Sequence, residues 1–233
     1  MFRLFVIALF TIFSCSGFGQ DTLNITDIQG FKQGFWRKSD SAGRVIYEGQ
    51  FKDGSPIGEF RYYYPNGKLK TVSLISQQGK RAVSNSYFPN GRKMASGIYI
   101  NEKKDSTWQF FSELNETLAS EEHYKDGVID GLSKVFYPEG GISEQRLYKK
   151  GIRDGHWEQY YPDGKLKLQG NYVAGEKQGS FKILYFSGQL MVGGQYNSGY
   201  PDGIWIYCNE KGTITKKEIY AKGALVKVEE TAK

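Results

Sequence analysis

The chain has 233 residues, with 31 Lys and Arg against 25 Asp and Glu, and a formal net charge of +6. Aromatic residues make up 15% of it, which excludes a disordered polar tail, and the 29 Gly and 6 Pro stay below the share that marks low-complexity sequences. Two cysteines cannot form a disulfide framework, and two histidines leave little room for histidine-based metal or triad chemistry.

Residues 1–19 are expected to be a cleaved signal peptide. A short positive start is followed by the apolar run 4–13 and then by small residues. Ten residues rise about 15 Å as a helix, half of a hydrocarbon core of roughly 30 Å, so the run is too short to span a membrane. Gly17 and Gly19 precede a cut that leaves Gln20 first. A buried N-terminal strand is the alternative.

A second processing route remains open at the same end. The segment Ile12-Phe13-Ser14-Cys15 resembles a bacterial lipoprotein box, which would make Cys15 a lipidation site, although Phe13 is bulky and the leader would be short. Ordinary cleavage removes Cys15 and leaves Cys208 as a lone thiol. We therefore expect a secreted or periplasmic protein, with an outer-membrane lipoprotein as the alternative.

The rest of the chain repeats every 24 residues. Pairs of glycines four residues apart mark the repeats: Gly30/Gly34, Gly54/Gly58, Gly127/Gly131, Gly151/Gly155, Gly175/Gly179 and Gly199/Gly203. Two degenerate copies lie near 78–82 and 103–107, and Gly223 closes the series. Eight repeats thus fill residues 30–223, between an N-terminal segment 20–29 and a charged C-terminal tail 224–233.

Each repeat is predicted to be a β-hairpin. In the copy from Gly151, residues 156–161 are rich in aromatics, 162–164 read Pro-Asp-Gly, and 166–172 form a second strand pattern. Glycines 175 and 179 are then expected to flank another turn. Because sequential hairpins pair side by side, the fold class is all-β, an elongated single-layer antiparallel meander of about eight 24-residue hairpin repeats.

The alternation of side chains along a strand gives the sheet two different faces. Trp157 has the aromatic equivalents Phe60, Phe181 and Trp205, which predicts a hydrophobic spine along one face. Glu158 and Tyr160 point to the other face, which is mixed and solvated.

Residues 148–166, YKKGIRDGHWEQYYPDGKL, carry a recognisable pattern, and 196–205 repeat its first half. The pattern resembles MORN-type repeats, in particular the variant class found in bacterial proteins. The resemblance covers residues 30–223 and implies a twisted, single-layer sheet of consecutive hairpins. It implies no common catalytic residues and no cofactor, and its members are mostly interaction or membrane-associated scaffolds, with some antitoxin-like proteins.

The third and fourth copies depart from this pattern. Val83 and Thr107 replace or displace glycines, and 114–116 replace a turn, so a bulge or kink is expected near residues 76–120. Aromatic cell-wall-binding repeats of about 20 residues are a second resemblance, but the period of 24 and the Asp-Gly-x-Trp order favour the MORN type.

Candidate chemical groups are few and dispersed. His123 and His156 are expected at the surface, and Cys208 is expected to fill an apolar column, with a crosslinking thiol as the alternative. The aspartates before the second glycines are Asp130, Asp154 and Asp202. They lie one per hairpin, too far apart for a Ca²⁺ site or a paired-carboxylate glycosidase, and are expected to make Asx turns.

The functional prediction rests on exposed aromatics. Tyr63, Tyr87, Phe136 and Tyr160 are the predicted binding-face residues. We expect an exported, non-enzymatic scaffold without metal or cofactor that binds another protein of the bacterial envelope. The alternatives are a polysaccharide or anionic-lipid binder, an antitoxin-like partner of an exported toxin, or an enzyme with unrecognised acids. Nucleic acid is not expected as a partner of an exported chain.

Overall fold

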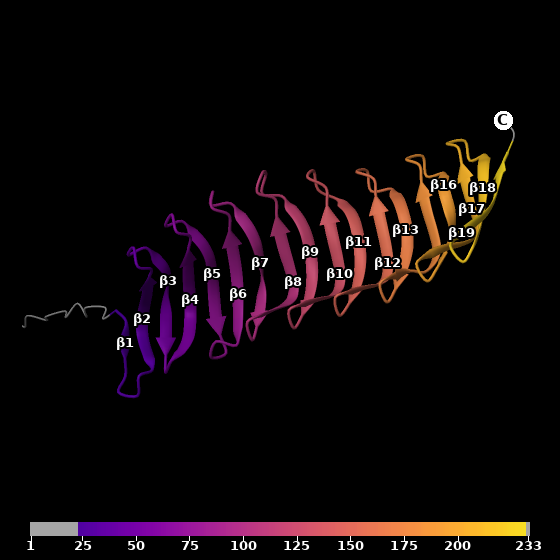
Figure 1. Cartoon of the computed structure of the whole chain (residues 1–233). Coiled ribbons are helices and arrows are strands. Elements are labelled where there is room, and N and C mark those ends of the chain that lie inside the picture. Colours follow the sequence, from indigo (N-terminus) through magenta and orange to yellow (C-terminus); the bar gives the residue numbers. More distant parts are fainter. Residues whose placement is uncertain (1–22, 232–233) are drawn as a thin grey trace, which may run out of the picture.

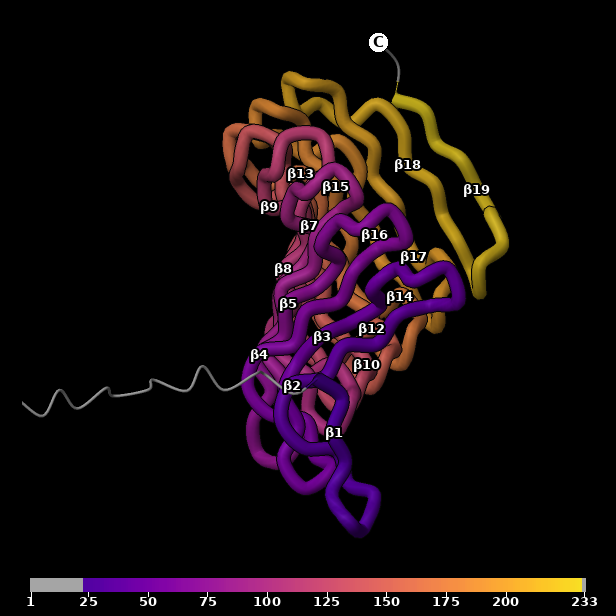
Figure 2. Tube along the Cα trace, turned by 90° about the vertical axis from the view of Figure 1, so that its left-hand side faces the viewer, coloured from indigo at the N-terminus to yellow at the C-terminus, as the bar shows by residue number. Residues whose placement is uncertain are grey.

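The computed structural model describes residues 23–231, which form one open antiparallel sheet of nineteen strands. Figure 1 shows the hairpins side by side in chain order, from β1 at one end of the array to β19 at the other. Figure 2, viewed from the β1 end, shows each hairpin turned relative to the one before, as expected of twisted strands. The predicted elongated, single-layer all-β meander is therefore confirmed.

The strands pair with their neighbours in chain order, except that β14 and β15 both pair with β13. Their bounds are β1 (Ile25–Thr26), β2 (Lys32–Ser39), β3 (Val45–Lys52), β4 (Ser55–Tyr63), β5 (Leu69–Ser76), β6 (Arg81–Tyr87), β7 (Lys93–Ile100), β8 (Lys103–Phe111), β9 (Leu118–Lys125), β10 (Val128–Phe136), β11 (Ile142–Lys149), β12 (Ile152–Tyr160), β13 (Leu166–Val173), β14 (Glu176–Lys177), β15 (Gly179–Leu184), β16 (Leu190–Asn197), β17 (Tyr200–Cys208), β18 (Ile214–Ala221) and β19 (Ala224–Glu230).

The first glycine of the second repeat and of the fifth to eighth repeats lies in a two-residue turn. In the sixth repeat, Lys149 pairs with Ile152, and the turn residues Lys150 and Gly151 have φ of 49° and 85°. Two positive φ values in succession define the turn type that matches the twist of the flanking strands, which is why glycine recurs there.

The second glycine lies inside a strand and not in the turn, contrary to the prediction. Gly155 belongs to β12, has a φ of 116°, and pairs with Tyr172. The register of the preceding pair shifts between Arg146 and Tyr148, which is the mark of a β-bulge.

The aspartate before the second glycine links neighbouring turns instead of forming a local Asx turn. Asp154 Oδ2 accepts the backbone N–H of Ala174 at 3.2 Å, and Asp202 Oδ1 accepts that of Lys222 at 3.3 Å. The Asx-turn expectation is therefore wrong for these two residues. Asx geometry occurs in the five-residue loops at the opposite ends of the hairpins, at Asp40, Asn66, Asn90, Asp163 and Asn209.

In four of the five-residue loops a tyrosine joins one repeat to the next. The hydroxyl of Tyr161 donates to the carbonyl of Leu184 at 2.8 Å, in the following hairpin. The same bond recurs with the same spacing of 23 residues for Tyr64 to Tyr87, Tyr137 to Tyr160 and Tyr185 to Cys208.

The hydrophobic spine consists of the residues two positions after each second-glycine position. These spine residues are Trp36, Phe60, Ser84, Trp108, Ser133, Trp157, Phe181 and Trp205. Four of the aromatic rings lie directly over a glycine of the preceding strand. A methyl carbon added at any of these glycines would overlap the ring or crowd it, so only glycine leaves room for the ring. The glycines, which we call the slot glycines, are Gly49 under Phe60, Gly97 under Trp108, Gly170 under Phe181 and Gly194 under Trp205.

The irregular central repeats differ from the prediction. Ser106, with a φ of 59°, and not Thr107, takes the second-glycine position, because it pairs with Tyr124 as Gly131 pairs with Tyr148. In the third repeat Ala82 takes this position without a positive φ, and β5 and β6 pair without a register shift. The third repeat thus lacks the bulge that the glycine-bearing repeats have.

The sheet continues beyond residue 223. Residues 224–230, predicted as part of a charged tail, form β19, which pairs with β18. All seven residues of β19 are exposed, since no further strand packs beside it among the described residues.

Replacing Gly194 by Ala is expected to lower the free energy of unfolding by about 1–3 kcal/mol, because the added methyl would overlap the Trp205 ring. The matched control is Gly193→Ala, where the methyl meets the end of the flexible Leu190 side chain at 3.2 Å. Neither glycine has a positive φ, so backbone strain does not contribute. Urea unfolding measures both variants, and equal losses would contradict the packing of rings on slot glycines.

Removing one inter-repeat hydroxyl, by Tyr161→Phe, is expected to cost about 0.5–1.5 kcal/mol, since the Leu184 carbonyl loses its donor. Tyr200→Phe is the control, because Tyr200 is 65% exposed. Thermal unfolding should show a lower Tm for Tyr161→Phe alone. A Tm unchanged in both variants would mean that this bond does not hold the repeats together.

Candidate functional site

The four aromatics predicted to bind lie in one row on the face opposite the spine. Tyr63, Tyr87, Phe136 and Tyr160 end the strands β4, β6, β10 and β12. Adjacent members of the row are at least two strands, about 10 Å, apart. All four side chains are half-buried and do not converge on one point.

Two of the three hydroxyls of this row are engaged within the protein. Tyr63 donates to Glu48 Oε1 at 2.5 Å, and Tyr160 donates to Glu158 Oε2 at 2.6 Å. Burial, together with the neighbouring carboxylate, raises the pKa of both hydroxyls. Tyr63 and Tyr160 therefore support the fold, and Tyr63 also lines a hollow of about 590 Å³ on this face, together with Arg37 and Glu48.

The remaining candidates stay isolated. His123 and His156 are exposed, and Cys208 is buried with 8% exposure. Cys15 lies outside the described residues. Within residues 23–231, no group of three His, Cys, Asp or Glu side chains is placed to hold a metal ion, and no helix is long and apolar enough to cross a membrane.

A groove of the described surface lies on the spine face, over β3 to β7, where the third repeat has Ser84 in place of an aromatic spine residue. This groove has a volume of about 600 Å³. Its lining includes Tyr47, Phe51, Pro56, Phe60, Tyr62, Lys70, Thr71, Ser73, Ile75, Gly79, Lys80, Ala82, Ser84, Tyr99 and Glu102. Sequence reasoning did not find it, although a serine that interrupts an aromatic column is a signal for a gap.

Two serines in succession create the groove. Between the Phe60 ring and the Trp108 ring that covers Gly97, the spine level carries Ser73 on β5 and Ser84 on β6. The hydroxyls of Ser73 and Ser84 share a hydrogen bond of 2.7 Å, so the floor is polar but satisfied.

The second serine of the spine does not open a comparable groove. Ser133 pairs across the hairpin with Arg146. Arg146 forms an ion pair with Glu144 on the same face, and the Trp157 indole donates to Glu144 at 2.6 Å. Long side chains thus occupy the level that stays open beside Ser84.

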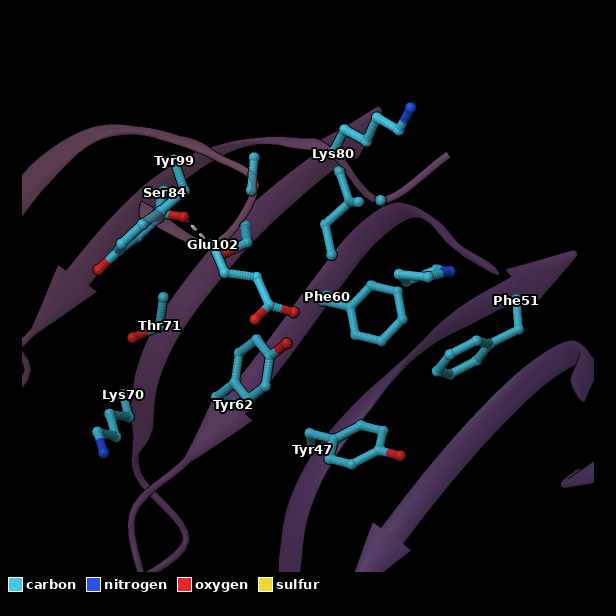
Figure 3. A pocket seen from close by; sticks show the side chains of 15 residues that line it. Tyr47, Phe51, Phe60, Tyr62, Lys70, Thr71, Lys80, Ser84, Tyr99 and Glu102 are labelled. Atoms are coloured by element: carbon cyan, nitrogen blue, oxygen red, sulfur yellow. Dashed lines mark hydrogen bonds between the residues drawn. The ribbon is translucent and has the colours of Figure 1, made fainter. Parts of the chain in front are cut away.

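Aromatic rings form the two walls. On one side, the ring centroid of Tyr47 lies 6.2 Å from that of Phe60 and 6.0 Å from that of Tyr62. On the other side, Tyr99 meets Trp108 edge-on at 4.8 Å. Figure 3 shows Tyr47, Phe60, Tyr62 and Tyr99 around the groove, with Ser84 close to Tyr99.

Three charged side chains lie along the groove. Figure 3 shows the carboxylate of Glu102 directed toward Phe60 and Tyr62, whereas the ammonium groups of Lys70 and Lys80 point away from the rings. Burial raises the pKa of Tyr62 and of Tyr99, and the Tyr47 and Glu102 charges add to the shift at Tyr62. Both hydroxyls therefore stay protonated at neutral pH and serve as hydrogen-bond donors.

This chemistry suits binding. Flat apolar rings beside hydroxyl groups and one carboxylate recognise a ligand by stacking, hydrogen bonding and charge. The groove holds no histidine or cysteine, and Glu102 is its one carboxylate.

Comparison with known families identifies the repeat. The family described as "MORN repeat variant" matches residues 56–73, 129–150 and 153–174. The chain is a MORN-type repeat protein, and the resemblance inferred from the sequence is confirmed. MORN repeats are generally non-catalytic binding modules.

Comparison with solved structures adds no functional information. A match to the "Crystal Structure of TarM" has 14% identity and a TM-score of 0.30, and it covers 40% of this chain and 20% of that chain. A TM-score this low carries no argument. The search of curated proteins gave no match.

Proposed function

We propose that this chain is an exported, non-enzymatic scaffold that binds a protein partner of the bacterial envelope in the groove beside Ser84. The observation that carries the proposal is the break in the spine, where Ser73 and Ser84 open a hollow of about 600 Å³ between aromatic walls. The general role of MORN repeats as binding modules supports it.

The rest of the array is a support for this site. Hydrogen bonds from loop tyrosines and the rings on slot glycines join each repeat to its neighbours. A surface held on strands in this way needs little ordering when a partner binds, which lowers the cost of association.

A glycan is the second candidate ligand. Tyr47, Tyr62 and Tyr99 offer ring faces, and the hydroxyls at the floor offer hydrogen bonds, which is a combination that also suits sugar rings. The two candidates differ in what the groove retains from an extract.

The decisive variant fills the groove. Ser73→Gly combined with Ser84→Phe rebuilds the pair of ring and slot glycine that the other repeats have. Both partners of the hydroxyl bond are removed together, which is close to neutral, so the stability should stay within about 2 kcal/mol of the wild type. Tyr87→Ser, on the opposite face, is the control for the row first predicted to bind.

Immobilised wild-type, groove-filled and Tyr87→Ser chains are compared for the proteins that they retain from an envelope extract, and a glycan array is run in parallel. We expect a partner retained by the wild type and by Tyr87→Ser, and at least about tenfold less by the groove-filled chain, the loss of about 1.4 kcal/mol. Binding lost only in Tyr87→Ser would move the site to the other face. Glycan signals without any protein partner would overturn the proposal in favour of the second candidate.

Export is tested separately on the mature protein. Intact mass spectrometry of the chain from its producing cell should show Gln20 as the first residue, because residues 1–19 have the pattern of a signal peptide. A diacylglyceryl mass on Cys15 would instead establish the lipoprotein route. A chain that retains Met1 in the cytoplasm would refute both routes.

A further inference from the structure

The array places a cation over its own aromatic rings in several repeats. The cation column lies two residues before the second-glycine position. Lys32 Nζ is 4.7 Å from the Trp36 ring centroid, and Lys104 Nζ is 4.7 Å from both Trp108 and Phe110. Lys177 Nζ lies 4.7 Å from Tyr196 and 5.5 Å from Phe181, and Arg153 lies 5.2 Å from Tyr172.

The second repeat keeps the rings and lacks the cation. Phe60 and Tyr62 correspond to Trp108 and Phe110, but Pro56 stands at the position of Lys104. Among residues 23–231, no ammonium or guanidinium lies over Phe60 or Tyr62 at cation–π distance, and Lys32 of the first repeat reaches only as far as Phe51, at 4.6 Å.

The second repeat also lacks a lysine at another position from which a cation can reach the rings, the position that pairs across the hairpin with Tyr62. In the eighth repeat, which likewise has a proline, Pro201, in the cation column, Lys216 pairs across the hairpin with Tyr207 and its Nζ lies 4.0 Å from that ring. In the second repeat the residue opposite Tyr62 is Thr71. The substitution of both positions leaves the faces of Phe60 and Tyr62 open to the groove.

The groove supplies the countercharge for an external cation. Glu102 belongs to a two-residue turn, makes no ion pair among the described residues, and directs its carboxylate toward these two rings (Figure 3). A carboxylate beside ring faces favours a cation on two grounds, the charge attraction and the negative face of each ring. The eighth repeat shows this combination inside the array, because Lys216 lies over the Tyr207 ring and forms an ion pair with Glu218 at 2.8 Å.

We propose that the groove binds a lysine side chain of the protein partner, with its ammonium over Phe60 and Tyr62 and beside Glu102. Lysine, and not arginine, is favoured because three lysines of the cation column each contact two or three rings, whereas Arg153 contacts one; these lysines are Lys32, Lys104 and Lys177. This inference rests on the proposed function and names the chemical feature of the partner that the groove reads.

The test uses two peptides that differ in one atom group. Acetyl-Gly-Gly-Lys-Gly-Gly-amide and the same peptide with norleucine are titrated into the ¹⁵N-labelled chain, and amide shifts of groove residues such as Gly79 and Ala82 report the binding. We expect the lysine peptide to bind about three- to tenfold more tightly, which is the range for a cation over partly desolvated rings.

Three variants locate the cation. Pro56→Lys supplies the internal cation and should abolish the preference for the lysine peptide. Pro201→Lys makes the same change in the eighth repeat, outside the groove, and should leave the preference intact. Glu102→Gln, in an exposed turn, should reduce the preference at least about threefold without altering the Tm.

The outcomes separate this inference from the proposed function. Equal groove binding of both peptides, or a preference that survives Pro56→Lys, would overturn the lysine assignment while leaving the groove as a binding site. Shifts produced by choline alone and by neither peptide would assign the rings to a free quaternary ammonium and would also overturn it. Failure of the groove-filling variant to affect partner retention would instead refute the proposed function.

Discussion

The packing of an aromatic ring on a glycine of the preceding strand is the contact on which this structure depends. A single-layer sheet has no second layer to cover its apolar face, so the rings of the spine must cover one another. The ring centroids of Phe181 and Trp205 lie 5.6 Å apart. Gly194, on the strand between them, has no side chain, so the Trp205 ring can lie directly on that strand. Each repeat is thereby stabilised by its neighbours, as in other repeat proteins.

The candidate site arises where this contact is missing. At Ser84 the ring is absent, the slot glycine is replaced by Ser73, and the two hydroxyls bond to each other. The array tolerates the change because its other inter-repeat bonds remain, including that from Tyr64 to Tyr87 across the same strands. Next to this gap, Pro56 and Thr71 stand at positions that hold Lys104 in the fourth repeat and Lys216 in the eighth. The interruption therefore affects ring packing and charge together.

Much of the fold could be predicted because the repeat places the same residue types at the same positions many times. Glycines at two-residue turns such as Gly151, and Asp163 in the five-residue loops, act on their own backbone neighbours, and their roles follow from local geometry. The roles of Asp154 and Tyr161 could not be predicted in this way. Their hydrogen bonds reach 20 and 23 residues along the chain, and the partner is determined by strand register.

The sequence by itself determined the class of fold, the period, and the two unlike faces, because these depend on glycine conformation and on the alternation of side chains along a strand. Only the tertiary structure decided which face carries the site. Tyr63 and Tyr160, chosen from the sequence, are held by carboxylates of their own face. The groove needs β3 to β7 side by side, since its walls are provided by Tyr47 on β3 and Tyr99 on β7, and its carboxylate by the turn between β7 and β8.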